Sequence, residues 1–162
     1  MLSMDDMIHE WQRGPYTVST DKARIALDLV LDMLATTYWA ANRPPKRTIK
    51  GIAHSLCFGL YHGDQQVGFA RVTTDYATIA YIGDVFVLPA FQGQGLAQWL
   101  IACILDHPEL QGIKRFLLTT RDAQGLYAKL GFMPLFAPER WMERLARSEN
   151  ADESIFDQVR DL

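Results

Sequence analysis

The sequence contains few of the residues from which metal centres and disulfide scaffolds are built. Of its 162 residues, two are cysteine and four are histidine. Cys57 and Cys103 each lie in an apolar stretch, which predicts two buried free thiols in a reducing, cytoplasmic setting. No histidine stands at metal-ligand spacing from a cysteine or an acidic residue, so we expect no metal.

Long apolar runs and an excess of positive charge are also missing. No apolar stretch reaches the roughly 18 residues that a membrane span needs. The first residues, MLSMDDMIHEWQRG, contain early acidic residues and no apolar signal segment. The formal net charge of −3 argues against a nucleic-acid partner and requires that any bound phosphate meet local donors. We therefore expect no membrane and no nucleic acid as partners.

Length and composition indicate a single globular domain over residues 1–162. With 49% apolar and 22% charged residues, the chain has the balance of an ordinary folded protein that buries a core. After Ala146 the sequence becomes rich in charge (RSENADESIFDQVRDL). We interpret residues 146–162 as a peripheral C-terminal tail.

The spacing of apolar residues predicts a mixed α/β fold. Predicted strands cover residues 16–19, 57–61, 67–72, 78–88, 115–120, 132–136 and 141–145, and predicted helices cover residues 23–36, 47–55, 96–106 and 122–130. The strands joined by short turns must be antiparallel neighbours. The helix that begins at Leu96 must cross over to residues 115–120, which then run parallel to the central strand. The expected architecture is a mostly antiparallel sheet with one parallel crossover and helices on both faces.

Residues 84–105, DVFVLPAFQGQGLAQWLIACIL, combine a strand, a glycine loop and an apolar helix. Pro89 ends the strand, and the helix begins near Leu96. The first N–H groups of a helix are unpaired and lie at its positive dipole end, so they can hold an anion. Gly93 and Gly95 keep side chains away from that end. The stretch therefore predicts a diphosphate site, with an ordinary tight turn as the alternative.

Two common phosphate-binding motifs do not fit this loop. A Walker loop needs Gly-Lys-Ser/Thr, but Leu96 and Ala97 follow Gly95. A dinucleotide fingerprint needs Gly or Ala where Gln98 stands. A third pattern, Q/R-x-x-G-x-G/A, is matched at every fixed position by residues 92–97. This loop, the strand before it and the segment LYAKLGF at residues 126–132 together resemble the GNAT (GCN5-related N-acetyltransferase) superfamily.

The resemblance implies acetyl-CoA as cosubstrate. The strand residues Phe86, Val87 and Leu88 would pair with the pantetheine arm, and a backbone N–H such as that of Val87 would polarise the thioester carbonyl. The loop residues that would cradle the pyrophosphate are Gln92, Gly93, Gln94, Gly95, Leu96 and Ala97. Thr120 stands where the family often has an asparagine and would also contact the cofactor. Strand splaying at the crossover would open a slot for the thioester.

The resemblance also implies that Tyr127 gives a proton to the leaving thiolate. A neutral phenol with a pKa of about 10 suits that task; the alternative is a tyrosine that packs in the core. Asp84 lies in an apolar strand, where desolvation should raise its pKa, and it is the candidate general base. A structural hydrogen bond is the alternative for Asp84. Weaker candidates are Tyr81, Asp75, Asp122 and His54, and water could also serve.

The leading hypothesis is an N-acetyltransferase that moves an acetyl group from acetyl-CoA to a primary amine in a direct, ternary complex. A non-catalytic CoA-binding sensor or interaction module is the alternative. The acceptor, a small molecule or a peptide, should contact the N-terminal helix pair, the loop at residues 38–45 with Tyr38 and Trp39, and the final strands. Asp32, Asp75 and Asp84 could favour a cation there. Homodimers are common in the superfamily and are a further expectation.

Overall fold

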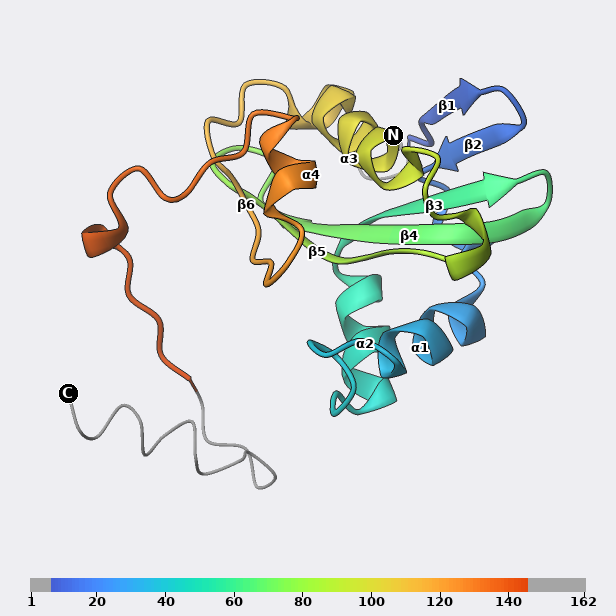
Figure 1. The fold of residues 1–162 in the computed structure, drawn as a ribbon, viewed down its shortest axis with the longest axis horizontal. Helices are drawn as coiled ribbons and strands as arrows, with labels where there is room; N and C mark the ends of the chain where they lie inside the picture. Colours follow the sequence, from blue (N-terminus) through green and yellow to red (C-terminus); the bar gives the residue numbers. More distant parts are fainter. Residues whose placement is uncertain (1–6, 146–162) are drawn as a thin grey trace. The chain divides into compact units, whose positions relative to one another are not determined.

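The computed structural model describes residues 7–145, and a six-stranded sheet organises the first compact unit of the chain (Figure 1). The strands lie side by side in chain order, and every neighbouring pair is antiparallel except β5 and β6, which are parallel. The predicted mixed α/β class, with one parallel crossover, is confirmed. The strands are β1 (Glu10–Arg13), β2 (Tyr16–Ser19), β3 (Leu56–His62), β4 (Gln65–Thr74), β5 (Ala80–Val87) and β6 (Phe116–Leu117).

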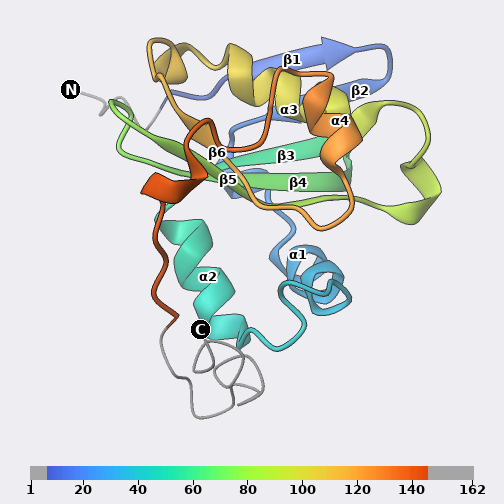
Figure 2. The same ribbon diagram turned by 60° about the vertical axis from the view of Figure 1, so that its left-hand side comes forward.

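Helices cover both faces of this sheet, as the sequence predicts. Figures 1 and 2 show α1 and α2 on one face and α3 and α4 on the other. Within residues 7–145, none of the helices has the length and apolar character to cross a membrane. The helices are α1 (Leu27–Ala35), α2 (Pro45–Ala53), α3 (Leu96–Asp106) and α4 (Gln124–Ala128).

The first predicted helix is interrupted near its start. A 3₁₀-helix covers Lys22–Arg24, Ile25 is extended, and α1 begins only at Leu27. The Ala26 N–H donates to Oε1 of the buried Gln66 at 2.7 Å, and this bond fixes residue 26 outside a helical ladder. The partner lies 40 residues away in the sequence, so local periodicity could not reveal the break.

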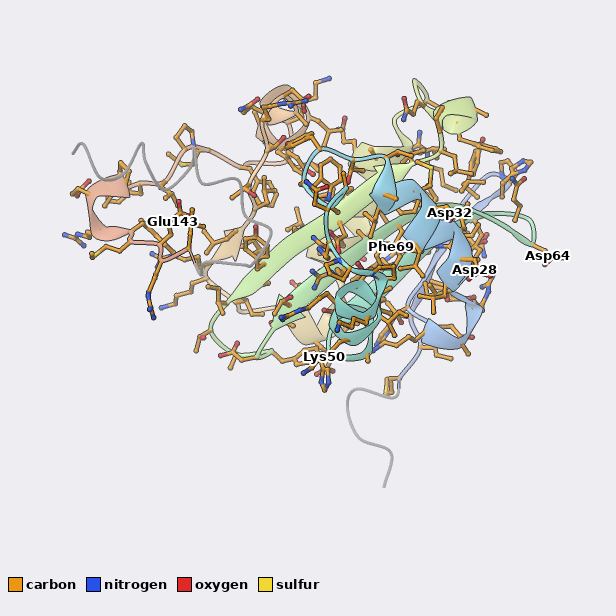
Figure 3. All side chains as sticks on the ribbon, turned by 90° about the horizontal axis from the view of Figure 1, so that it is seen from below. Asp28, Asp32, Lys50, Asp64, Phe69 and Glu143 are labelled. Carbon is orange, nitrogen blue, oxygen red and sulfur yellow. The ribbon has the colours of Figure 1, made fainter. Side chains whose placement is uncertain are left out.

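The core between the sheet and the pair α1 and α2 forms from alternate strand residues. Val30 and Leu34 are four residues apart on α1 and pack with Cys57, Phe69 and other residues of one apolar cluster. Figure 3 views this face and shows Phe69 behind the helices, with Asp28 and Asp32 on α1 and Lys50 on α2. The apolar stripe of α1 thus faces the sheet, and its polar stripe is exposed.

The opposite face packs against α3. Phe58, the residue after Cys57 on β3, contacts the ring of His107 at the end of α3, at 5.7 Å between ring centroids. Trp11 of β1 lies over the same phenylalanine and donates from Nε1 to Asp106 at 2.8 Å. The strand β1 is not predicted from the sequence, because its residues EWQR carry one apolar side chain and gain order from these contacts.

The second compact unit begins at Phe132, directly after Gly131 with its φ of +88°. Residues 132–145 contain a 3₁₀-helix at Pro138–Arg140 and no strand. The predicted strands at residues 132–136 and 141–145 are therefore wrong. Pro134 stands inside the first of them and lacks the N–H that a strand ladder needs. The predicted tail at residues 146–162 lies outside the described residues.

Candidate active site

The glycine loop before α3 depends on two left-handed backbone positions. Gly93 has a φ of +81° and Gly95 a φ of +75°, values that residues with a Cβ rarely adopt. A Cβ on Gly93 would meet nothing within 4 Å, and one on Gly95 would lie 3.7 Å from Nη2 of Arg13. Glycine is thus required by the backbone conformation rather than by crowding.

The start of α3 is open to an anion. Gly95 is the N-cap residue and has no side chain that could accept a hydrogen bond from the first turn of this helix. The first turn contains no acidic residue that would repel a phosphate. The N–H groups of a helix start and its dipole favour a negative charge at this place.

The first hairpin of the sheet holds the loop in shape. Arg13 of β1 donates from Nη2 to the Gln94 carbonyl oxygen at 3.1 Å, and the Tyr16 hydroxyl donates to Oε1 of Gln94 at 3.0 Å. Gln92 donates from Nε2 to the carbonyl oxygen of Val87 at 2.9 Å. The loop is therefore preorganised by residues more than 75 positions away in the chain, and no local sequence pattern predicts these contacts.

A bulge lies in the middle of β5. On β4, Phe69 pairs with Phe86 and Arg71 pairs with Gly83, so Asp84 and Val85 together oppose one residue of β4. Asp84 has a φ of +52°, in the left-handed region that residues other than glycine seldom occupy. Bulges of this kind bend a strand and redirect a side chain, and they are frequent beside active sites.

The parallel pair separates early. Only Ala80 and Tyr81 of β5 pair with β6. The Leu88 N–H bonds to the Val67 carbonyl oxygen of β4 at 2.8 Å. Because bonded and non-bonded pairs alternate along an antiparallel ladder, the N–H and C=O of Val87 must face the opposite edge, where the carbonyl oxygen already accepts from Nε2 of Gln92. An extended ligand chain can pair with the backbone there.

A first cavity of about 720 Å³ runs along this open edge to the glycine loop. Seven of the predicted cofactor residues line it: Phe86, Val87, Gln92, Gly93, Gly95, Leu96 and Ala97. The other three do not. Leu88 packs against the core, Gln94 bonds to Tyr16, and Thr120 lines a different cavity.

A second cavity of about 640 Å³ lies on the other side of the β5 bulge. Its lining includes Asp84, Arg43 and Arg71, together with aromatic residues of the loop after α1. Four residues line both cavities: Trp39, Val85, Ala123 and Tyr127. The two cavities therefore meet at Tyr127.

Tyr127 lies on α4 and is half-buried. Burial, and next the nearby Tyr38, raise the pKa of the Tyr127 hydroxyl above its ordinary value. A raised pKa keeps the phenol protonated at neutral pH. The side chain can therefore donate a proton at the junction of the two cavities.

Comparison with known proteins agrees with this geometry. The model of the Acetyltransferase (GNAT) family matches residues 6–132. A Gibberella zeae protein provisionally named as an acetyltransferase is 32% identical over 142 residues, covering 74% of this chain and 79% of that protein. A crystal structure from Xanthomonas campestris pv. campestris, provisionally assigned to the same family, has a TM-score of 0.78 and 46% identity, covering 81% of this chain and 93% of that one.

The chain belongs to the GNAT acetyltransferase family. An N-acetyltransferase of Prochlorococcus marinus, uncharacterised and described as ycf52-like, is 30% identical over 132 residues, which cover 78% of this chain and 68% of that protein. The glycine loop, the splayed pair and Tyr127 all lie inside the matched part of the chain.

Asp84 differs from the expectation formed from the sequence. It is buried, with only 2% of its side chain exposed, but Arg43 and Arg71 both donate to its Oδ2, at 2.7 and 2.6 Å. Burial alone would raise the pKa of the Asp84 carboxyl, yet the hydrogen bonds and charges of the two arginines outweigh burial and lower it. The predicted raised pKa is wrong. Asp84 is a carboxylate held by an ion pair, and its lowered pKa makes it a weaker base than the sequence predicts.

The weaker base candidates are dispersed. Tyr81 and Asp122 line the second cavity, whereas Asp75 and His54 line neither of the two cavities. The Asp75 carboxylate accepts hydrogen bonds from the backbone of its own turn, including one from Thr78 at 2.8 Å. Among residues 7–145, no three His, Cys, Asp or Glu side chains gather as a metal site would require.

Arg43 and Arg71 are the site residues that sequence reasoning missed. Arg71 stands in the apolar run VGFARV of β4, and a charged residue in such a run signals a buried partner of opposite charge. Arg43 lies in the loop between α1 and α2 and has no local signal. Its partner Asp84 is 41 residues away, and only the fold brings them together.

Proposed function

We propose that this GNAT protein transfers an acetyl group from acetyl-CoA to an amine by direct attack within a ternary complex. The observation that carries the proposal is that two cavities meet at Tyr127. One is lined by the glycine loop and the open edge of β5, which suit a diphosphate and an amide-containing arm. The other is lined by polar and aromatic residues, which suit an acceptor.

The residues of the first cavity fit coenzyme A at both ends. The start of α3 would hold the pyrophosphate by backbone N–H groups, and the edge of β5 that β6 leaves open would pair with the pantetheine amides. A structure from Clostridium acetobutylicum, described as a predicted acetyltransferase with acetyl-CoA, shares the fold with a TM-score of 0.59 at 14% identity. That likeness concerns the fold, and the fit of the residues supports the ligand.

Two groups of the chain would take part in the reaction: the Tyr127 hydroxyl as a proton donor and the Val87 N–H as a donor to the developing oxyanion. The amine nitrogen forms a bond to the thioester carbon, the carbon–sulfur bond breaks, and the Tyr127 hydroxyl gives its proton to the departing sulfur. The Val87 N–H, on the open edge of β5, would bind the carbonyl oxygen as negative charge develops. The proton released by the amine passes to water, because Asp84 is committed to two arginines.

Direct transfer is favoured because neither cysteine is placed to carry an acetyl group. Cys57 and Cys103 are both buried, and neither lines the two cavities. Burial raises the pKa of the Cys57 thiol to about 11 and that of Cys103 to about 12. At neutral pH both thiols stay protonated and are poor nucleophiles.

Titration calorimetry with acetyl-CoA, followed by mass detection of products from a panel of amines, tests the proposal. We expect binding together with an acetylated amine. A chain that binds acetyl-CoA but acetylates no amine would be a binding module instead. A lack of heat at millimolar acetyl-CoA would contradict the cofactor assignment itself.

A further inference from the structure

The charged side chains of the second cavity favour an anion. The lining contains three cationic residues, Arg43, Arg71 and Arg121, and two anionic ones, Asp84 and Asp122. The net charge of the lining is 3 − 2, or one positive charge.

Asp32 and Asp75, which the sequence suggested as attractors for a cation, are exposed and line neither cavity. The expected preference for a cation is therefore not supported by the residues that line the cavity.

The positive charge is concentrated at the β5 bulge. Arg43 and Arg71 bind the same oxygen of Asp84, so one carboxylate faces two guanidinium groups. Arg121 does not belong to this cluster. Its guanidinium group stacks on the Tyr38 ring at 3.9 Å and pairs with Asp122 at 3.5 Å. The side chains of Arg121 and Asp122 are both largely exposed. The local excess at Asp84 is two positive charges against one negative.

The two arginines keep donors for a further anion. Arg71 also donates from Nη1 to Ser55 and Thr73, at 3.1 and 3.4 Å, which fixes the plane of its guanidinium group. Among the described residues, the side-chain hydrogen bonds of Arg43 use Nη1 alone, so its Nε and Nη2 groups remain available. About a quarter of the Arg43 side chain and a fifth of the Arg71 side chain are exposed, at 26% and 21%, whereas Asp84 is enclosed. An incoming anion can therefore reach the arginines.

We propose that the acceptor is an amine that also carries a carboxylate, and that Arg43, with Arg71 beside it, binds this carboxylate. The inference rests on the proposed function. A guanidinium fork matches a planar carboxylate and binds it through two parallel hydrogen bonds. A single negative charge also balances the local excess, whereas a doubly charged phosphate would exceed it. The cavity reaches Tyr127, so a small amino acid can place its amine at the junction.

Matched acceptor pairs test this proposal on the full-length chain. Free amino acids and ω-amino acids are compared with their own amides, which keep the amine and lose the carboxylate. With saturating acetyl-CoA, we expect kcat/KM to be roughly 10- to 100-fold higher for the acids, the range for a hydrogen bond to a charged group. Aminoalkyl phosphates form a third arm, and a preference for them would overturn the carboxylate assignment.

Variants of the arginine provide the second readout. Arg43→Gln should lower kcat/KM for the acids by roughly 10- to 100-fold, mainly by raising KM. The kcat/KM for the amides should stay nearly unchanged. Arg43→Lys, which keeps the charge, should lose less. Arg47→Gln removes the same charge from an exposed position of α2 that lines neither cavity, and it should match the wild type.

Two results would overturn the proposal while leaving the proposed function intact: amides that react as well as acids, or an Arg43→Gln variant that slows both classes equally. The second result would show that the arginines only brace Asp84. Absence of acetyl-CoA binding by the wild type, measured separately by calorimetry, would instead remove the proposed function and this inference with it.

Discussion

Gly95 shows how one backbone angle can define a binding loop. Its φ of +75° is unfavourable for any L-residue with a side chain, although the space around the missing Cβ is not crowded. The sequence pattern identified this glycine correctly, but attributed it to room for a phosphate. The structure adds the conformational reason, and the two reasons predict different effects of a small substitution.

Gly95→Ala should lower the free energy of unfolding by about 1–2 kcal/mol, because alanine must adopt a left-handed conformation. It should also weaken acetyl-CoA binding, since relief of the strain would shift the loop. Gly125→Ala is the matched control: this glycine lies inside α4, and a Cβ there would meet nothing within 4 Å. Denaturant unfolding should show a gain of about 0.4–1 kcal/mol for the control. A loss of similar size in both variants would refute the assignment to φ.

For Asp84, the sequence predicts burial but not the two arginines that surround its carboxylate. Its place in an apolar strand predicted burial correctly, and burial alone implied a raised pKa. The two arginines that reverse the shift come from positions 13 and 41 residues away. Arg71 in its apolar run signals a buried partner of opposite charge, but no local pattern identifies Asp84 as that partner. The bulge that gives Asp84 its positive φ depends on the pairing of β4 with β5 and was also beyond sequence reasoning.

Asp84→Asn should destabilise the protein by about 2–3 kcal/mol, because it leaves two guanidinium groups facing one another without their counterion. The partial exposure of both arginines keeps the loss below that of a fully enclosed ion pair. Asp32→Asn, at an exposed position on α1, is the control and should change stability by less than about 0.5 kcal/mol. Chemical denaturation measures both. Equal effects would mean that the cluster contributes nothing to the fold.

At the scale of elements, sequence reasoning succeeds where the signal is local. The glycine loop with α3, and the antiparallel hairpin of β3 and β4, were predicted within a few residues of their observed bounds. The strand β6 was predicted over residues 115–120 but pairs only at Phe116 and Leu117. The early separation of β6 from β5 creates the open edge of the site. This separation follows from the arrangement of the sheet rather than from the strand propensity of residues 118–120.

The end of α3 contains a buried histidine that should make stability depend on pH. His107 is 2% exposed, and its Nδ1 accepts a hydrogen bond from the Glu109 N–H at 3.2 Å. Burial, followed by the nearby His9, lowers the pKa of His107 to about 4. The unfolded chain therefore binds a proton more readily than the folded protein between pH 6.5 and pH 4.

Stability should accordingly fall as the pH drops from about 6.5 towards 4, by no more than about 3 kcal/mol from this group. His107→Asn retains a side-chain acceptor for the Glu109 N–H but cannot titrate, so its unfolding free energy should vary less over this range. Equilibrium unfolding at a series of pH values measures the difference. Parallel curves for the two proteins would show that His107 does not titrate as described.

At the scale of the whole molecule, the site is built from elements on both faces of one sheet. The loop after α1 contributes Trp39 and Arg43, the start of α3 contributes the glycine loop, and α4 contributes Tyr127. A ligand that spans these elements should stabilise all of them together. Binding should therefore be visible as a change in the unfolding of the first compact unit, which contains all of these elements.

Acetyl-CoA at 100 times its dissociation constant should add about 2.7 kcal/mol of stability. For a chain of this length, that corresponds to a rise in Tm of about 5–11 °C. Differential scanning calorimetry measures the shift, and Gly95→Ala at the same ligand concentration should show a smaller one. An unchanged Tm for the wild type at saturating ligand would conflict with a cofactor site formed by these elements.

The most direct test of the account is the turnover of Tyr127→Phe with acetyl-CoA and an amine that the wild type acetylates. We expect kcat to fall by roughly 10²- to 10⁴-fold, the span of an acid–base group, while acetyl-CoA affinity is retained. Tyr76→Phe, which makes the same change away from both cavities, should keep the wild-type rate. A Tyr127→Phe variant that turns over as fast as the wild type would contradict the central claim that this phenol protonates the leaving thiolate.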